Sequence, residues 1–357
     1  MSDARGLIER LVAFPSVAGR PNGELAGFIR GWLEDHGAGC RVIEGERGRV
    51  GLLAQAGPSA TAGVLLAAHM DVVAVEGQDW DGDPWTLEQR DGRLVGRGSA
   101  DMKGFLACAM EAMAQAAAAP AALPLLLAVS TDEELGCVGV RDLLPVVAAL
   151  DPAPAACLVG EPTGMRLVTA HKGKLAQRAT LRGQARHSSE APLATNAVEL
   201  AAELVLALRD RGRELGSSGR RDHRFAIPHA TISVGPIRGG TALNIVPDRC
   251  TVEFEVRTLP GEDAAELLPA LGDAELERLA EYPPLDGDAA AFDGLIEAEP
   301  GAAIDYGTEA GLYARLGIAT AVCGPGDIAD AHRAGESLAI EQLEACRAAL
   351  ATLVARL

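Results

Sequence analysis

Four short apolar runs, separated by helical or turn-rich segments, constrain the fold of the first half of the chain most strongly. Such runs have the length of buried strands, and connections of this size allow successive strands to lie parallel in one sheet. The pattern predicts an α/β domain in which a mostly parallel sheet is covered by helices on both faces. The expected strands are residues 49–55, 63–68, 123–130 and 155–159, and the expected helices are residues 3–14, 24–36, 102–118 and 138–150.

The pattern changes at about Lys174. Alternating strands expected at 175–182, 230–238 and 249–257 flank helices at 196–210 and 262–271, an α+β arrangement. Residues 209–224, RDRGRELGSSGRRDHR, are polar and interrupted by glycine and serine, which predicts a mobile surface loop. The α/β pattern then returns, with a strand at 320–323 and a helix at 338–357. We therefore expect an α/β domain of residues 1–173 and 284–357, interrupted by an inserted α+β module of residues 174–283.

Charge and cysteine content limit the partners and the compartment. The chain has 32 basic and 50 acidic residues, a formal net charge of −18, which repels nucleic acid and anionic lipid. Seven scattered cysteines without a CxxC pair argue against a disulfide framework or a thiolate metal site. The most apolar stretch, 105–129, is interrupted by Glu111 and by prolines, and the N-terminus does not resemble a secretory signal. We expect a cytoplasmic protein that binds neither membranes nor nucleic acid.

Histidine and carboxylate residues follow the expected strands, at the end of the sheet where open α/β folds bind ligands. His69 comes directly after one expected strand, and Asp71 is placed to hold its imidazole. Asp101 lies in a glycine-flanked turn before a helix, and three successive acids, 132–134, follow another strand. Each signal has a simple alternative: a strand-end polar pair, a helix N-cap, or acids that complement a helix N-terminus.

Glu161 and His332 extend this set, because they also follow expected strands. Five such residues would give each of two divalent cations one histidine and one terminal carboxylate, with Asp101 shared between them. Imidazole and carboxylate without thiolate suit zinc, which we expect first, and also cobalt or manganese. Glu133, left over beside a ligand, is the natural general base. The expected metal ligands are His69, Asp101, Glu134, Glu161 and His332.

Five motifs, in this order, resemble those of the metal-dependent amidohydrolase family that includes acetylornithine deacetylase, succinyl-diaminopimelate desuccinylase and glutamate carboxypeptidase. They are HMDVV, GRGSADMKG, TDEELG, GEPTG and AHRAGES, and they span nearly the whole chain. The resemblance implies that the inserted module is a lid, which in this family commonly forms the interface of a homodimer. It also implies the following roles: His69 and Glu161 on the first metal, Glu134 and His332 on the second, Asp101 as the bridge, Glu133 as the base, and Asp71 orienting His69.

The resemblance extends into the lid. His187 in ARHSSEAP matches the family histidine that polarises the scissile carbonyl, often in the partner's site, with an ordinary loop histidine as the alternative. Asn244 in ALNIVPD and Arg257 in EVRTLPG match substrate-contacting positions; a guanidinium can grip a carboxylate, or can form a strand-end ion pair. Three departures bear on lid shape and substrate choice: Arg186 and Ala194 stand where glycine is usual, and Gly335 where aspartate or asparagine is usual.

Within the family, the acetylornithine deacetylases share most motifs with this chain, including GRGSADMKG, GEPT, RTLPG and TEAG. The resemblance implies hydrolysis of an N-acyl amino acid, most specifically N-acetylornithine to ornithine and acetate in arginine biosynthesis. Glu309 precedes an expected helix, where it either meets a cationic substrate side chain or complements the helix N-terminus. Another N-acyl amino-acid hydrolase, a desuccinylase, a metallo-exopeptidase and an inactive metal-binding module are the alternatives.

Overall fold

The computed structural model describes residues 4–119 and 122–357 and divides into two compact units. The first contains the described residues up to Ala170, together with Leu285–Ala302 and Thr308–Leu357, and the second contains His171–Pro284 and Ala303–Gly307. Residues 303–307, which we expected in the α/β domain, lie instead in the second unit. There Lys172 Nζ lies 3.0 Å from Asp305 Oδ1, and His171 forms a β-bridge with Ile304.

A six-stranded sheet with the order β1-β2-β6-β3-β7-β14 forms the centre of the first unit. β3 pairs in parallel with β6 and β7, and β14 with β7, whereas β2 is antiparallel to β1 and β6. The predicted α/β class with a largely parallel sheet is confirmed. The strands are β1 (Gly39–Glu44), β2 (Val50–Ala56), β3 (Val64–His69), β6 (Leu125–Ser130), β7 (Ala156–Val159) and β14 (Ala319–Val322).

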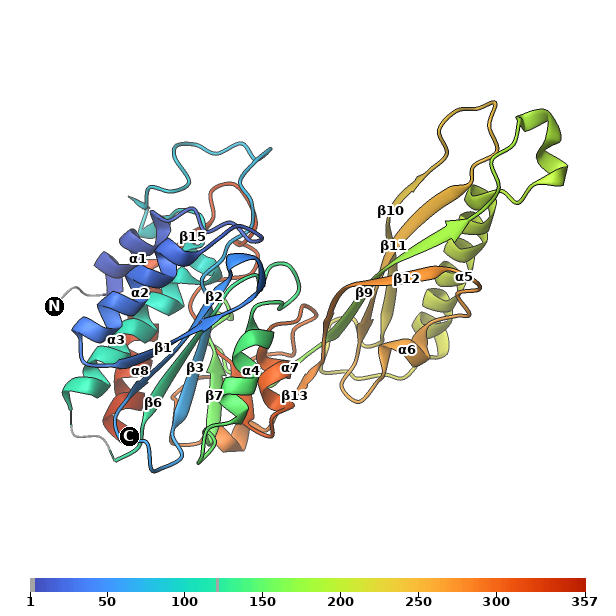
Figure 1. The fold of residues 1–357 in the computed structure, drawn as a ribbon. Coiled ribbons are helices and arrows are strands. Elements are labelled where there is room, and N and C mark those ends of the chain that lie inside the picture. The colour runs from blue at the N-terminus through green and yellow to red at the C-terminus, as the bar shows by residue number, and fades with distance from the viewer. Residues whose placement is uncertain (1–3, 120–121) are drawn as a thin grey trace. The chain divides into compact units, whose positions relative to one another are not determined.

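Helices cover both faces of this sheet (Figure 1). One face carries α1 (Ala4–Val12), α2 (Gly23–Asp35), α3 (Gly104–Ala118) and α8 (Ile340–Arg356), and the other carries α4 (Val140–Ala148) and α7 (Ala310–Ala314). α3 is apolar almost all round because it packs between the sheet, α1 and α8. Burial of each large apolar side chain there contributes about 1.5–3 kcal/mol. Residue 3 of the first expected helix lies outside the described residues.

Gly160, directly after β7, lets α3 come close to the sheet. A β-carbon at this position would lie 2.0 Å from the ring of Phe105 on α3, far inside van der Waals contact. A glycine here therefore allows the end of β7 to lie close to the start of α3. Polar residues of the expected metal site follow β7 and precede α3.

A small three-stranded sheet supports the loops beside the central sheet. It consists of β4 (Glu88–Arg90), β5 (Arg93–Val95) and β15 (Ser337–Ala339), in the order β15-β5-β4. Gly96 N–H donates to the carbonyl of Glu336 over 3.0 Å, so the pairing of β5 with β15 continues into the segment before β15. The short strands β8 (Ala170–His171) and β13 (Leu285–Asp286) lie at the chain boundaries between the units.

The second unit is an antiparallel sheet with one helical face. The sheet has the order β10-β11-β9-β12, with β9 (Gly173–Arg182), β10 (Thr231–Gly239), β11 (Arg249–Thr258) and β12 (Glu275–Tyr282). Alternate residues of β9 and β11, among them Ala179, Val252 and Phe254, pack with Leu204 and Leu208 of α5 (Ala197–Ser218). β12 was not predicted, because half of its residues are exposed and it has little apolar alternation.

Two predictions in this unit are wrong. α5 continues to Ser218, so much of the expected loop at 209–224 is helical. In this stretch Leu215 is buried and the Arg211–Glu214 ion pair of 2.7 Å adds a small stabilisation, while Arg221 donates hydrogen bonds to the carbonyls of Leu215 and Gly216 at the end of the helix. The helix expected at 262–271 is confined to α6 (Ala264–Leu267).

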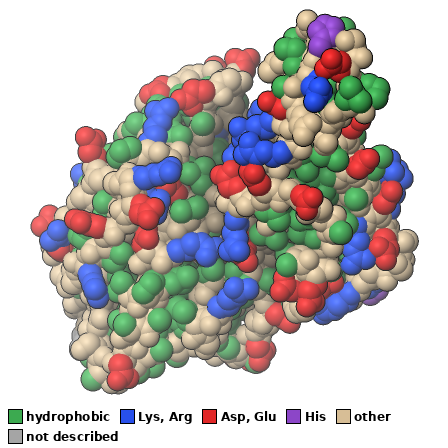
Figure 2. All heavy atoms as spheres, turned by 45° about the vertical axis from the view of Figure 1, so that its right-hand side comes forward, with side chains coloured by type: hydrophobic (Ala, Val, Ile, Leu, Met, Phe, Trp, Pro, Cys, Tyr) green, Lys and Arg blue, Asp and Glu red, His purple; other side chains and the backbone are tan. Residues whose placement is uncertain are grey.

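The drawn face (Figure 2) carries charges of both signs, and the cysteines are not joined in disulfides. On the face drawn in Figure 2, Lys and Arg side chains lie among Asp and Glu side chains. All seven cysteines are free thiols. Within residues 4–119 and 122–357, none of the helices has both the length and the apolar character needed to cross a bilayer.

Candidate metal centre

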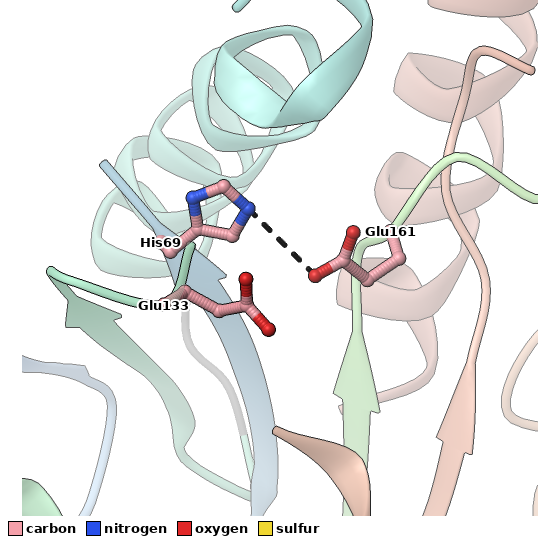
Figure 3. A group of neighbouring side chains, drawn as sticks. All are labelled: His69, Glu133 and Glu161. Atoms are coloured by element: carbon pink, nitrogen blue, oxygen red, sulfur yellow. Dashed lines mark ion pairs between the residues drawn. The ribbon is translucent and has the colours of Figure 1, made fainter. Parts of the chain in front are cut away.

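Three neighbouring parallel strands bring the first polar residues together. His69 is the last residue of β3, which lies between β6 and β7 in the sheet. Glu133 and Glu134 follow β6, and Glu161 follows β7 by two residues. Because the carboxyl ends of parallel strands share one edge of the sheet, the side chains of His69, Glu133 and Glu161 point into a common space (Figure 3).

Asp101 and His332 reach the same place from outside the sheet. Asp101 lies in the irregular turn at 99–103 that leads into α3, and His332 lies in the loop between β14 and β15 with a left-handed φ of 60°. Asp101 Oδ1 lies 3.0 Å from His69 Nε2, and Asp101 Oδ2 lies 3.0 Å from His332 Nε2. The two oxygens of one carboxylate thus face two different imidazoles, which is the geometry of a bridging ligand.

Each imidazole also faces a second carboxylate. His332 Nε2 lies 3.1 Å from Glu134 Oε1, and His69 Nε2 lies 3.7 Å from Glu161 Oε1. The candidate ligand atoms of Asp101, Glu134 and His332 all lie within 4.8 Å of one another. The structure therefore brings together all five residues expected as metal ligands.

Burial of four acids in one place gives the site its electrostatic character. Burial and then the charge of Asp101 raise the pKa values of Glu134 and Glu161. Burial also opposes ionisation of Asp101, but hydrogen bonds to His332 and His69 outweigh it and hold the pKa of Asp101 low. The same contacts, first to Asp101 and then to Glu134, raise the pKa of His332 to about 10.

This arrangement fits divalent cations. Two imidazoles and three carboxylates face one another with no thiolate among them, a donor set that suits zinc, cobalt or manganese. Positive charge relieves the repulsion among buried carboxylates, which is otherwise costly.

Glu133 lies next to the expected metal ligands but is not one of the five. A carboxylate oxygen of Glu133 lies within 4.8 Å of the ligand atoms of His69 and Glu161 (Figure 3). Burial, partly offset by His69, raises the pKa of Glu133 to about 8. A carboxylate that readily takes a proton next to two metal ligands is suited to general-base chemistry.

Asp71 organises two parts of the centre at once. His69 Nδ1 lies 3.0 Å from the backbone carbonyl of Asp71 and 3.5 Å from its carboxylate Oδ1. The same carboxylate accepts hydrogen bonds from the backbone N–H groups of Glu133 and Glu134, each over 3.2 Å. The sequence indicated contact with the imidazole, whereas the contact with the turn at 133–134 depends on the pairing of β3 with β6 and was missed.

Glu336 is a supporting residue to which the sequence analysis gave no role. Its Oε1 accepts hydrogen bonds from the backbone N–H groups of Ala100 and Asp101, over 3.1 and 3.0 Å. Its Oε2 lies 2.6 Å from Arg97 Nη1, and both side chains are buried. Through the two hydrogen bonds to Oε1, Glu336 fixes the backbone that presents Asp101. The sequence offered one signal for this role: Glu336 belongs to the motif AHRAGES, shortly after His332.

The predicted lid residues His187, Asn244 and Arg257 lie in the second unit. His187 pairs with Ile245 in a β-bridge, and Ser188 N–H donates to the Asn244 carbonyl over 3.0 Å, so His187 and Asn244 are neighbours. His187 is exposed, and its Nδ1 lies 2.8 Å from Ser189 Oγ.

Arg257 and Glu309 already have partners. On β11, the guanidinium of Arg257 donates to Glu255 over 2.9 Å and to the Tyr282 hydroxyl over 2.8 Å. In the first unit, Glu309 is 1% exposed and accepts a hydrogen bond from Ser130 Oγ. Burial raises the pKa of Glu309 to about 7.

The imidazoles and carboxylates that converge at the edge of the α/β sheet define a candidate centre for divalent cations. Residues 65–356 match the model of Peptidase family M20/M25/M40, and the chain belongs to this family. Membership makes the protein a metal-dependent hydrolase of amide bonds.

Solved structures share the fold along almost the full chain. An M20 family metallo-carboxypeptidase from Sulfolobus solfataricus has a TM-score of 0.81 at 19% identity, with 99% of both chains covered. Human carnosine dipeptidase 1 has a TM-score of 0.71 at 15% identity, covering 99% of this chain and 96% of that one. A dinuclear metal-binding M20 peptidase from Bacillus subtilis has a TM-score of 0.66 at 15% identity, covering 98% and 96%.

Proposed function

We propose that the protein uses two divalent metal ions to remove the acyl group from an N-acyl amino acid, with N-acetylornithine as the preferred substrate. The observation that carries the proposal is the placement of Asp101, whose two oxygens each lie 3.0 Å from a different histidine. In this proposal His69 and Glu161 hold the first ion, Glu134 and His332 hold the second, and Asp101 bridges them. Zinc is the expected metal, and cobalt and manganese are alternatives.

The chain's own residues supply positioning and proton transfer. Bound divalent cations polarise an amide carbonyl and lower the pKa of water. Glu133 takes the proton from the attacking water and gives it to the leaving amine, since its carboxylate lies beside His69 and Glu161. Asp71 holds His69 through its carbonyl and holds the turn at 133–134 through its carboxylate.

N-acetylornithine is proposed on the motifs shared with acetylornithine deacetylases, which would place the enzyme in arginine biosynthesis. Glu309 is the proposed contact for the ornithine ammonium, and Asn244 and Arg257 are proposed contacts for the rest of the substrate. For Arg257 to bind a substrate carboxylate, its guanidinium would have to break its hydrogen bond to Glu255 or to the Tyr282 hydroxyl. A metallo-exopeptidase is the second candidate, because a carboxypeptidase and a dipeptidase share the fold along almost their whole length.

We also propose that the chain forms a homodimer through the second unit and acts in the cytoplasm. Near His187 the surface exposes Leu243 completely, Leu193 to 69% and Ile245 to 40%, apolar area that a second copy would cover. His187 would then polarise the substrate carbonyl in the partner's site. Seven unpaired thiols suit a reducing compartment. Sedimentation of the wild type and of Leu243→Asp tests the dimer, which the variant should weaken.

The test of function is turnover of a substrate panel by the metal-loaded protein, with released amine as the readout. The panel contains N-acetylornithine, other N-acetyl amino acids, succinyl-diaminopimelate and several dipeptides. Preference for N-acetylornithine is expected, and Glu133→Gln should retain both metals while losing turnover by at least about a thousandfold. Cleavage of dipeptides alone would favour the exopeptidase, and loss of metal from Glu133→Gln would make this residue a ligand.

A further inference from the structure

The loop after the proposed base folds back on itself through an unusual backbone. Gly136 and Cys137 have φ values of 98° and 56°, so two successive residues are left-handed. The carbonyl of Glu133 accepts hydrogen bonds from the N–H groups of both, over 2.7 and 2.8 Å. A left-handed conformation is ordinary for glycine but costs a residue with a β-carbon about 1 kcal/mol or more, and such residues gather at functional sites.

The left-handed turn brings the Cys137 thiol back to the Glu133 side chain. Cys137 Sγ lies 3.1 Å from Glu133 Oε1, and Cys137 is completely buried. A thiol is protonated at neutral pH, and burial, then the charge of Glu133, raises the pKa of Cys137 further. The S–H group is therefore the donor and the carboxylate oxygen the acceptor.

We propose that Cys137 is a positioning residue for the catalytic base, with its thiol holding one carboxylate oxygen of Glu133 so that the other is presented to the attacking water. This inference rests on the proposed role of Glu133 as the base. A glutamate side chain has three rotatable bonds, and a hydrogen bond to one oxygen restricts the last of them. A misplaced base slows proton transfer without weakening substrate binding, because the thiol contacts the base and not the substrate.

The first test compares Cys137→Ala, Cys137→Gly and Cys137→Ser on the amide that the substrate panel identifies. Cys137→Ala should lower kcat about tenfold, with KM within about twofold and the metal content unchanged. Cys137→Gly relaxes the left-handed backbone yet also lacks the donor, so it should lose as much kcat as Cys137→Ala. Cys137→Ser keeps a hydroxyl donor and should recover most of the loss.

A matched control and a second readout separate positioning from general damage. Cys346→Ala removes an equally buried thiol from α8 and should retain the wild-type kcat. In infrared spectra, the S–H stretching band that Cys137→Ala removes should move to higher frequency in Glu133→Ala, because its hydrogen bond is lost. The position of this band does not depend on catalytic activity, so it reports on the hydrogen bond alone.

Three results would overturn the inference: wild-type kcat in Cys137→Ala, equal losses in Cys137→Ala and Cys137→Ser, or an S–H band that Glu133→Ala leaves in place. Failure of the underlying role looks different. If Glu133→Gln keeps full turnover, Glu133 is not the base, whereas an inactive Glu133→Gln beside a fully active Cys137→Ala removes only the inference on the thiol.

Discussion

Replacement of Glu336 tests whether the proposed bridging carboxylate of Asp101 depends on the hydrogen bonds that Glu336 accepts from the backbone. Glu336 pairs with Arg97 at 2.6 Å and accepts the N–H groups of Ala100 and Asp101. Glu336→Ala removes the charge and the oxygen that accepts both N–H groups. Glu336→Gln removes the charge but keeps an amide oxygen where Oε1 accepts the two N–H groups. The two variants therefore separate the effect of the ion pair with Arg97 from the effect of the hydrogen bonds that support the backbone of Asp101.

The structure sets the magnitudes. Arg97 is 0% exposed, and removing one partner of a buried ion pair costs about 3–5 kcal/mol. For a unit of this size, such a loss lowers Tm by about 6–20 °C. Both variants should show this loss of stability. Loss of a group that orients a metal ligand typically weakens metal binding by about 10–100-fold, which we expect of Glu336→Ala alone.

Calorimetric unfolding and competition for zinc with a chromophoric chelator measure the two effects. Replacing both partners, as in Arg97→Met with Glu336→Leu, should recover much of the stability, since apolar substitutes for buried ion pairs are often tolerated. It should not restore metal affinity, because the two backbone N–H groups still lack their acceptor. Wild-type metal affinity in Glu336→Ala, or an equally weak Glu336→Gln, would refute the proposed support of Asp101.

Three further predictions follow from other contacts. Gly160→Ala should cost at least about 1–3 kcal/mol in urea unfolding, because its β-carbon would lie 2.0 Å from the Phe105 ring; an unchanged midpoint would contradict that packing. Asp71→Ala should lower kcat at least about tenfold by releasing the turn at 133–134, and unchanged kinetics would remove its orienting role. Free zinc at about a hundred times Kd should stabilise the fold by about 2.7 kcal/mol for each bound ion over chelator-treated protein, and equal Tm values would argue against a bound metal.

The sequence predicted the parts of the centre that follow directly from strands. His69, Glu134 and Glu161 each follow a buried apolar run, and parallel pairing then places them at one edge of the sheet. His332 and Asp101 lie on loops, and their convergence was expected only from the combined set of motifs. Their observed positions depend on contacts distant in sequence, such as Glu336 with the backbone of Asp101.

Elements with weak local signals were missed or misjudged. β1 buries only Ile43 and β12 buries only Tyr282, so neither has the clear apolar alternation from which strands are predicted. The stretch 209–218 is rich in glycine and charge, yet it continues α5, where Leu215 is buried and Arg221 donates a hydrogen bond to the carbonyl of Leu215. The left-handed turn at Cys137 has no sequence signature beyond its preceding glycine, and its contact with Glu133 emerged only from the structure.

Metal stoichiometry measured against turnover tests the central claim most directly. Metal-free protein is titrated with cobalt, and bound cobalt and amide hydrolysis are followed in the same samples. Two ions per chain are expected for the wild type, with full activity when both are bound, and Asp101→Ala should bind fewer ions and lose activity. A single ion per chain at full activity, or a fully active Asp101→Ala, would contradict a centre in which Asp101 bridges two metals.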